Sequence, residues 1–140
     1  MQEDGIQLRG QLLIYPAVDL VCHRPSIAAF ANVPPFKNAS VVAVAETYLG
    51  RSISAGIPRY ASPIEGDVSR VAPAYIETPQ FDLLHDQGND YARALMDKGV
   101  AVDLNEITGG IHGFDLLAAN SSLAKAAMQR RIEFLRRIFA

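Results

Sequence analysis

The feature that most constrains the fold of this chain is an alternation of strand-like and helix-like segments over residues 74–139. Residues 74–81 read as a strand, residues 86–99 have the apolar spacing of a helix, and apolar and polar side chains alternate over residues 100–107. A last helix follows over residues 121–139. Strands joined through helices form a parallel sheet with right-handed crossovers, so we predict an α/β fold.

The ends and faces of these helices can also be predicted. Asp86 is placed to cap the first helix, Gly99 to end it, and Ser121 or Ser122 to cap the last one. The apolar stripe of the last helix should face the core, and it consists of Met128, Ile132, Leu135 and Phe139. We expect the basic residues of this helix to form a solvated face rather than a binding patch, namely Arg130, Arg131, Arg136 and Arg137.

The first half of the chain reads as one buried strand followed by a mostly irregular connection. Residues 12–15 are an unbroken apolar run, typical of a parallel strand buried on both faces. Prolines make residues 21–35 and 51–73 irregular, with one helix between them over residues 41–49. Its candidate caps are Asn38 or Ser40 before it and Gly50 after it. We therefore predict one domain segment, residues 1–140, divided into an irregular connection (19–73) and a strand–helix unit (74–140).

Composition argues against several classes of function. Hydrophobic residues make up 49% of the chain and charged residues 20%, and the net charge of -2 favours neither nucleic acid nor an anionic membrane surface. The apolar runs are far shorter than the ~20 residues of a membrane helix, and the start lacks the features of a signal peptide. We expect a cytoplasmic chain. The single Cys22 allows no internal disulfide, and no metal-ligand spacing or nucleotide-binding motif occurs, so no metal or cofactor is predicted.

Two titratable residues follow the predicted strands of the second half. Asp82 comes after the first strand and His112 after the second, at a separation of about one strand–helix–strand circuit. Side chains at the carboxyl ends of adjacent parallel strands can approach within hydrogen-bonding distance, and a carboxylate on Nδ1 prepares an imidazole as a general base. The alternative is that both residues only cap their elements. For His23 and His85, surface roles are expected.

A nucleophile for this base is missing from the sequence. No G-x-S-x-G pentapeptide occurs, and the nearest approach, residues 52–56 (SISAG), has serine in place of the first glycine and follows a helix rather than a strand. Cys22 has no neighbour that would activate a thiolate.

Four stretches resemble the hormone-sensitive-lipase-like esterases of the α/β-hydrolase superfamily. They are QLLIYPAVD (11–19), YLG with ASP (48–50 and 61–63), FDLLHDQG (81–88) and GIHGF (110–114). The resemblance implies that Asp82 is the acid and His112 the base of a catalytic triad, with Asp86 structural. It also implies that the chain is the C-terminal part of the fold, about three strands of an incomplete sheet. Residues 19–73 then lie near the lid, and the serine and oxyanion motifs lie upstream.

Two residues depart from the family pattern in the strand before Asp82. Glu77 stands where an apolar residue is usual, and a buried charge is costly unless it is paired. Pro79 removes a hydrogen bond from the strand unless it lies where the pairing ends. Leu83 replaces a common proline, which we regard as minor.

The resemblance implies a carboxylic-ester hydrolase acting on a small-molecule ester, with this chain inactive alone. A non-catalytic ligand-binding relative is one alternative, although such relatives typically lose the histidine. A truncated, self-associating fragment is another. If the resemblance holds, the first strand lacks one neighbour, so we expect a homo-oligomer, or pairing with an N-terminal half through that strand edge.

Overall fold

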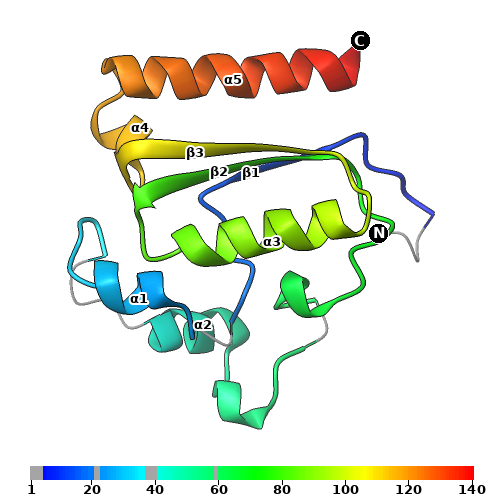
Figure 1. The fold of residues 1–140 in the computed structure, drawn as a ribbon. Helices are drawn as coiled ribbons and strands as arrows, with labels where there is room; N and C mark the ends of the chain where they lie inside the picture. The colour runs from blue at the N-terminus through cyan, green and yellow to red at the C-terminus, as the bar shows by residue number, and fades with distance from the viewer. Residues whose placement is uncertain (1–4, 21–22, 37–40, 59) are drawn as a thin grey trace.

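A three-stranded parallel sheet between two layers of helices forms the centre of the molecule. The computed structural model describes residues 5–20, 23–36, 41–58 and 60–140. Within these residues the strand order is β1–β2–β3, and the strands are β1 Gln11–Ile14, β2 Ala74–Phe81 and β3 Val102–Ile111. Figure 1 shows helix α3 on one face of the sheet and α5 on the other; they span His85–Asp97 and Ser122–Phe139. The predicted α/β architecture is confirmed.

Shorter helices lie around this centre. Helices α1 (Pro25–Phe30) and α2 (Val41–Leu49) lie on the α3 side, whereas α4 (Phe114–Leu117) lies at the end of β3 (Figure 1). The connection over residues 51–73 holds two 3-10 turns, η1 (Ile53–Ala55) and η2 (Pro63–Glu65). None of the helices in the described ranges has the length and apolar character that crossing a bilayer requires.

The core is divided between the two faces of the sheet. On the α3 face, a buried cluster joins β2 to α3 and the loops before β2; it consists of Val18, Val68, Ala74, Ile76, Tyr91, Ala92 and Leu95. On the α5 face, a second cluster joins β3 to α4 and α5; it consists of Ile107, Phe114, Ala124 and Ala127. Burial of each large apolar side chain contributes about 1.5–3 kcal/mol, so these two clusters hold both helices against the sheet.

Strand β2 carries the two sequence departures, and the structure accounts for both. Residues 74–79 of β2 are all buried, because β2 is the central strand and helices cover both of its faces. The pairing of β2 with β3 becomes irregular between Pro79 and Phe81, so the proline lies where the regular ladder ends. Glu77 is fully buried and is paired, as described below.

The outer strand β1 is less buried than predicted. All four of its residues are only partly buried, whereas its apolar sequence predicts a strand covered on both faces. In the described residues it pairs with β2 alone, so one edge and part of each face lack a covering neighbour. The apolar run of β1 therefore predicts more burial than the described residues provide.

Helix α1 lies within a stretch that was expected to be irregular. Pro25 occupies the first helical position, where its missing N–H costs nothing and its fixed φ suits a helix. The backbone N–H of Ser26 donates to the carboxylate of Asp86 at 2.8 Å, and the Ser26 hydroxyl donates to the carbonyl of Leu83 at 2.9 Å. The expectation was wrong because α3 stabilises this short helix from a distant part of the sequence.

The other element boundaries were predicted closely, with two exceptions. β3 begins two residues later than predicted and runs four residues further, since β2 offers it a partner along that length. Asp86 is not the N-cap of α3, because the helix already begins at His85. Ser121 is the N-cap of α5 and accepts a hydrogen bond from the N–H of Ala124 at 3.1 Å, as predicted. The predicted caps Asn38 and Ser40 lie outside the described residues.

The buried face of α5 differs from the predicted one. Met128, Ile132 and Phe139 of the predicted stripe are exposed, at 47%, 36% and 68%. The residues that face the sheet are instead Ala124, Ala127, Arg131 and Phe134. Small alanines let the helix approach the sheet closely, and Arg131 is drawn inward by Glu77. The interpretation of Arg131 as part of a solvated face was therefore wrong.

Candidate active site

The two candidate residues from the sequence meet at the carboxyl edge of the sheet. Asp82 follows β2 and His112 follows β3, and Nδ1 of His112 lies 2.8 Å from Oδ2 of Asp82. The side chain of Asp82 is 0% exposed and that of His112 is 18% exposed. A carboxylate buried at this distance from Nδ1 accepts the proton of that nitrogen, which leaves Nε2 as the basic nitrogen of the neutral ring.

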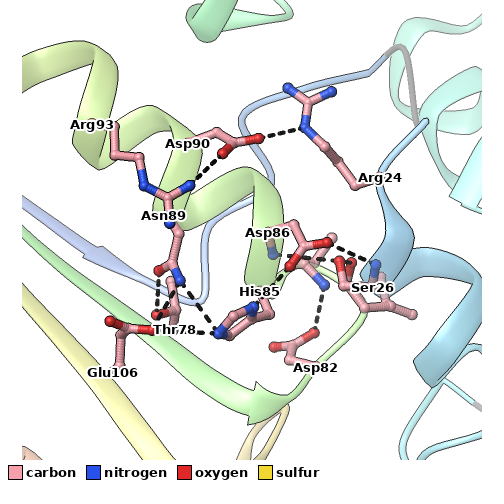
Figure 2. A network of polar contacts seen from close by, with 12 residues as sticks. Arg24, Ser26, Thr78, Asp82, His85, Asp86, Asn89, Asp90, Arg93 and Glu106 are labelled. Atoms are coloured by element: carbon pink, nitrogen blue, oxygen red, sulfur yellow. Dashed lines mark hydrogen bonds and ion pairs between the residues drawn. The ribbon is translucent and has the colours of Figure 1, made fainter.

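The second oxygen of Asp82 is held by the turn that leads into α3. The N–H of Leu84 donates to Oδ1 of Asp82 at 2.9 Å, and the N–H of His85 donates to the Asp82 carbonyl at 3.0 Å. Figure 2 shows Asp82 directly below the start of α3. The first N–H groups of a helix have no partner within the helix, so the start of α3 has a donor available that orients this carboxylate.

The imidazole of His112 contacts two aromatic rings. The ring centroids of Tyr15 and Phe36 each lie 4.4 Å from the centroid of His112, one tilted and one edge-on. Gly113 follows with a φ of 69°, a left-handed conformation that lets the chain turn directly into α4. Among the described residues, Asp82 is the hydrogen-bond partner of this ring, and Nε2 has none. The ring is thus held by two aromatic contacts and at one nitrogen.

A second network, around His85 and Asp86, fixes the start of α3. Nδ1 of His85 lies 2.9 Å from Oδ1 of Asp86, and the other ring nitrogen faces Asn89 and Glu106 at 3.3 and 3.7 Å (Figure 2). Burial raises the pKa of Asp86, but hydrogen bonds from His85 and from the backbone of Ser26 outweigh it and lower the pKa overall. His85 therefore ties α3 to β3 rather than facing solvent alone, and Asp86 ties α3 to α1.

A buried ion-pair network connects Glu77 to the neighbourhood of His112. Arg131 donates from two nitrogens to the carboxylate of Glu77 and, at 2.6 Å, to Oδ2 of Asp115. The hydroxyl of Tyr75 donates to Glu77 at 2.7 Å, and that of Tyr15 donates to Asp115 at 3.2 Å. Burial raises the pKa of Tyr15, and the adjacent Asp115 carboxylate raises it further, so this hydroxyl stays protonated. Sequence reasoning missed this network, although the isolated charge of Glu77 in a strand was a signal for it.

The other candidates from the sequence do not join this site. His23 is exposed, and residues 53–55 of the SISAG stretch form the turn η1, anchored through Ser52 to Glu46 at 2.6 Å. That turn follows α2 rather than a strand, so it is not a strained strand-to-helix turn. Cys22 lies outside the described residues. Across the described ranges, no three His, Cys, Asp or Glu side chains are grouped so as to hold a metal ion.

Comparison with known proteins places this arrangement in a family. A family model described as the alpha/beta hydrolase fold matches residues 1–116. An ethyl acetate hydrolase of Pseudomonas putida is 37% identical over 107 residues, which cover 76% of this chain and 33% of that protein. Carboxylesterase NlhH of Mycobacterium tuberculosis is 32% identical over 136 residues, which cover 95% of this chain and 43% of that protein.

Solved structures agree with the sequence relatives. An esterase of Pyrobaculum calidifontis superposes with a TM-score of 0.84 at 28% identity, covering 99% of this chain and 47% of that one. A bacterial heroin esterase superposes with a TM-score of 0.90 at 24% identity, covering 99% and 45%, which shows the fold alone. The chain thus spans between a third and just under half of the length of these proteins. It belongs to the α/β-hydrolase fold family, among the esterases and lipases that resemble hormone-sensitive lipase, and covers part of that fold.

Proposed function

We propose that this chain carries the acid and the base of a serine-dependent carboxylic-ester hydrolase, with Asp82 as the acid and His112 as the base. The observation that supports this most is the 2.8 Å contact between Oδ2 of the buried Asp82 and Nδ1 of His112. The relatives that are named as an ethyl acetate hydrolase and a carboxylesterase support a small-molecule carboxylic ester as the substrate class. The nucleophilic serine is supplied by a polypeptide segment that the 140 residues do not include.

The proposed reaction is acyl transfer in two steps, acylation of the serine and hydrolysis of the acyl-enzyme. Nε2 of His112 takes the proton of the serine hydroxyl while the serine oxygen attacks the ester carbonyl, and Asp82 stabilises the imidazolium that forms. When the tetrahedral intermediate collapses, the C–O bond to the alcohol breaks and the imidazolium returns the proton to the departing alkoxide. Water then repeats the attack with His112 again as base, which releases the carboxylic acid and restores the serine.

Complementation tests this proposal. The chain is fused behind the N-terminal segment of the Pseudomonas putida relative, and hydrolysis of p-nitrophenyl acetate is measured. His112→Ala is expected to reduce the rate about 10²–10⁴-fold, the range for loss of a general base, and Asp82→Asn is expected to weaken it as well. His23→Ala is the matched control, because His23 is an exposed histidine before helix α1. Activity that is indifferent to His112 and Asp82 would remove both assignments.

The chain alone should then be inactive. Because we propose that the nucleophile comes from another segment, the isolated 140 residues are expected to hydrolyse p-nitrophenyl acetate no faster than the solvent background. A fluorophosphonate, which labels activated serines covalently, should leave the mass of the chain unchanged. A stoichiometric adduct on any serine of this chain would contradict the proposal.

We also propose that the outer edge of β1 pairs with a strand of the missing segment. Within the described residues β1 has one partner, and its side chains are only partly buried. An unpaired edge exposes N–H and C=O groups that another strand can satisfy. Without that segment the chain should self-associate through the same edge, which sedimentation velocity over a range of concentrations will detect. A single monomeric species at high concentration would argue against this.

A further inference from the structure

Tyr15 stands out because its backbone conformation is unusual and both of its ends are held. Its backbone φ is 38°, a left-handed value that residues other than glycine rarely adopt. Such a conformation persists where the surroundings hold it in place. Here the N–H of Tyr15 donates to the carbonyl of Glu77 at 2.7 Å, and its hydroxyl donates to Oδ1 of Asp115 at 3.2 Å. The ring between these two anchors is the one that lies against His112.

The two anchors of Tyr15 belong to one buried structure. Arg131 joins the carboxylates of Glu77 and Asp115, and the three side chains are 6%, 0% and 10% exposed. The planar guanidinium reaches both carboxylates at once, which a lysine ammonium would do less well. Asp115 also lies in α4, directly after the turn that carries His112. The ion pairs therefore fix the segment before the imidazole, through Tyr15, and the segment behind it, through α4.

We propose that Asp115 and Arg131 are positioning residues for His112, acting through the hydroxyl and ring of Tyr15. Neither residue touches the reacting atoms. Arg131 fixes Asp115, Asp115 fixes the Tyr15 hydroxyl, and the Tyr15 ring then limits the orientations that the imidazole can take while Asp82 holds its Nδ1. The inference rests on the proposed function, because a general base needs its free nitrogen aimed at one point.

The network's geometry distinguishes this role from simple stabilisation. A purely structural ion pair would need only Arg131 and Glu77, which already satisfy each other within the core. The additional bond from Tyr15 to Asp115 joins a loop to α4, and the Tyr15 ring lies against His112 in a tilted contact. Removing the hydroxyl of Tyr15 keeps the ring and leaves no buried charge unpaired. Tyr15→Phe therefore removes one hydrogen bond of the network with little other disturbance.

The test is an NMR titration of the His112 ring in the 140-residue chain. Ring ¹⁵N and ¹H resonances report which nitrogen carries the proton, the titration midpoint and the ring current of neighbouring aromatic groups. Tyr15→Phe and Asp115→Ala are expected to shift the His112 resonances in the same direction. The double variant should shift them no further than Asp115→Ala alone, because Asp115→Ala already removes the bond that Tyr15→Phe removes. Asp115→Glu, which keeps a carboxylate, should shift them less than Asp115→Ala.

Controls separate this outcome from general damage and from failure of the proposed function. Tyr48→Phe is matched in chemistry, but Tyr48 is 72% exposed, so the His112 resonances should not move. Unshifted resonances in Tyr15→Phe would overturn the inference even if Asp115→Ala failed to fold, and additive shifts would reject a route through Tyr15. None of these readouts requires ester hydrolysis. In the fused enzyme, Tyr15→Phe should lower kcat by up to about 100-fold at unchanged KM, the size of effect that misplacement of a reacting group produces.

Discussion

Replacing Arg131 with methionine should strongly destabilise the fold. Glu77 would keep the hydroxyl of Tyr75 as a donor but lose both guanidinium nitrogens, while its side chain remains 0% exposed. Leaving such a charge unpaired in a protein interior costs about 3–5 kcal/mol. A folded domain is held by roughly 5–15 kcal/mol, so at the lower end of that range this single change would remove more than half of the free energy of unfolding.

The same reasoning predicts that a second substitution will partly reverse the first. Glu77→Gln removes the buried charge but keeps an oxygen that accepts the Tyr75 hydroxyl. The double variant Glu77→Gln/Arg131→Met should therefore be more stable than Arg131→Met alone, by about 2 kcal/mol, since it contains no unpaired charge in the core. Asp115 keeps its bond from Tyr15 and lies near enough to the surface, at 10% exposure, to be hydrated.

Urea denaturation followed by circular dichroism measures these free energies of unfolding. Arg93→Met is the matched control: Arg93 pairs with Asp90 at 2.8 Å, but its side chain is 67% exposed, so the loss should stay within about 1 kcal/mol. The reasoning fails if Arg131→Met costs no more than this control. It also fails if the effects of the two substitutions at positions 77 and 131 simply add, because coupling between the charges is the basis of the prediction.

Three further predictions use other parts of the structure. Ser121→Ala should lower the free energy of unfolding by about 1 kcal/mol by removing the N-cap of α5, whereas Ser122→Ala stays within about 0.5 kcal/mol in the same urea assay. Gly88→Ala should destabilise α3 although alanine favours helices, because the new Cβ would lie 2.6 Å from Cγ2 of Thr78; overpacking of about 1–3 kcal/mol exceeds a helix gain of about 1 kcal/mol. Burial raises the pKa of Asp115, but hydrogen bonds from the guanidinium of α5 lower it overall. Stability from this carboxylate is thus present above its ordinary pKa and lost as the pH falls through the lower folded value, so Asp115→Asn should flatten the loss of stability below about pH 4.

Local patterns predicted the strand–helix unit because the sequence signals for its elements lie within each element or directly beside it. The strand-like composition of residues 74–81, the alternation over residues 100–107, the glycine after α3 and the serine before α5 are each visible within a few residues. Helix α1 was not predictable in this way, since its stabilising partners are Asp86 and the carbonyl of Leu83, nearly sixty residues away. A helix that is stabilised mainly by residues distant in sequence cannot be predicted from its local pattern.

The approach of Asp82 to His112 could be inferred from topology alone. Both residues directly follow parallel strands, and parallel strands place their carboxyl ends at one edge of the sheet. The rings of Tyr15 and Phe36 that hold the imidazole could not be inferred, because they come from loops whose path depends on the packed structure. The residues that surround a site from loops are therefore harder to predict than the residues that directly follow its strands.

The face of α5 shows why periodicity alone cannot decide which residues are buried. Two stripes of the same spacing run along this helix, one with the larger apolar side chains Met128 and Ile132 and one with Ala127, Arg131 and Phe134. Hydrophobicity selects the first stripe, but the sheet selects the second, because Glu77 of the central strand needs a cation and the small alanines allow close approach. Glu77 is unusual in a buried strand, and Arg131 is unusual on the buried face of a helix. The ion pair between them explains both.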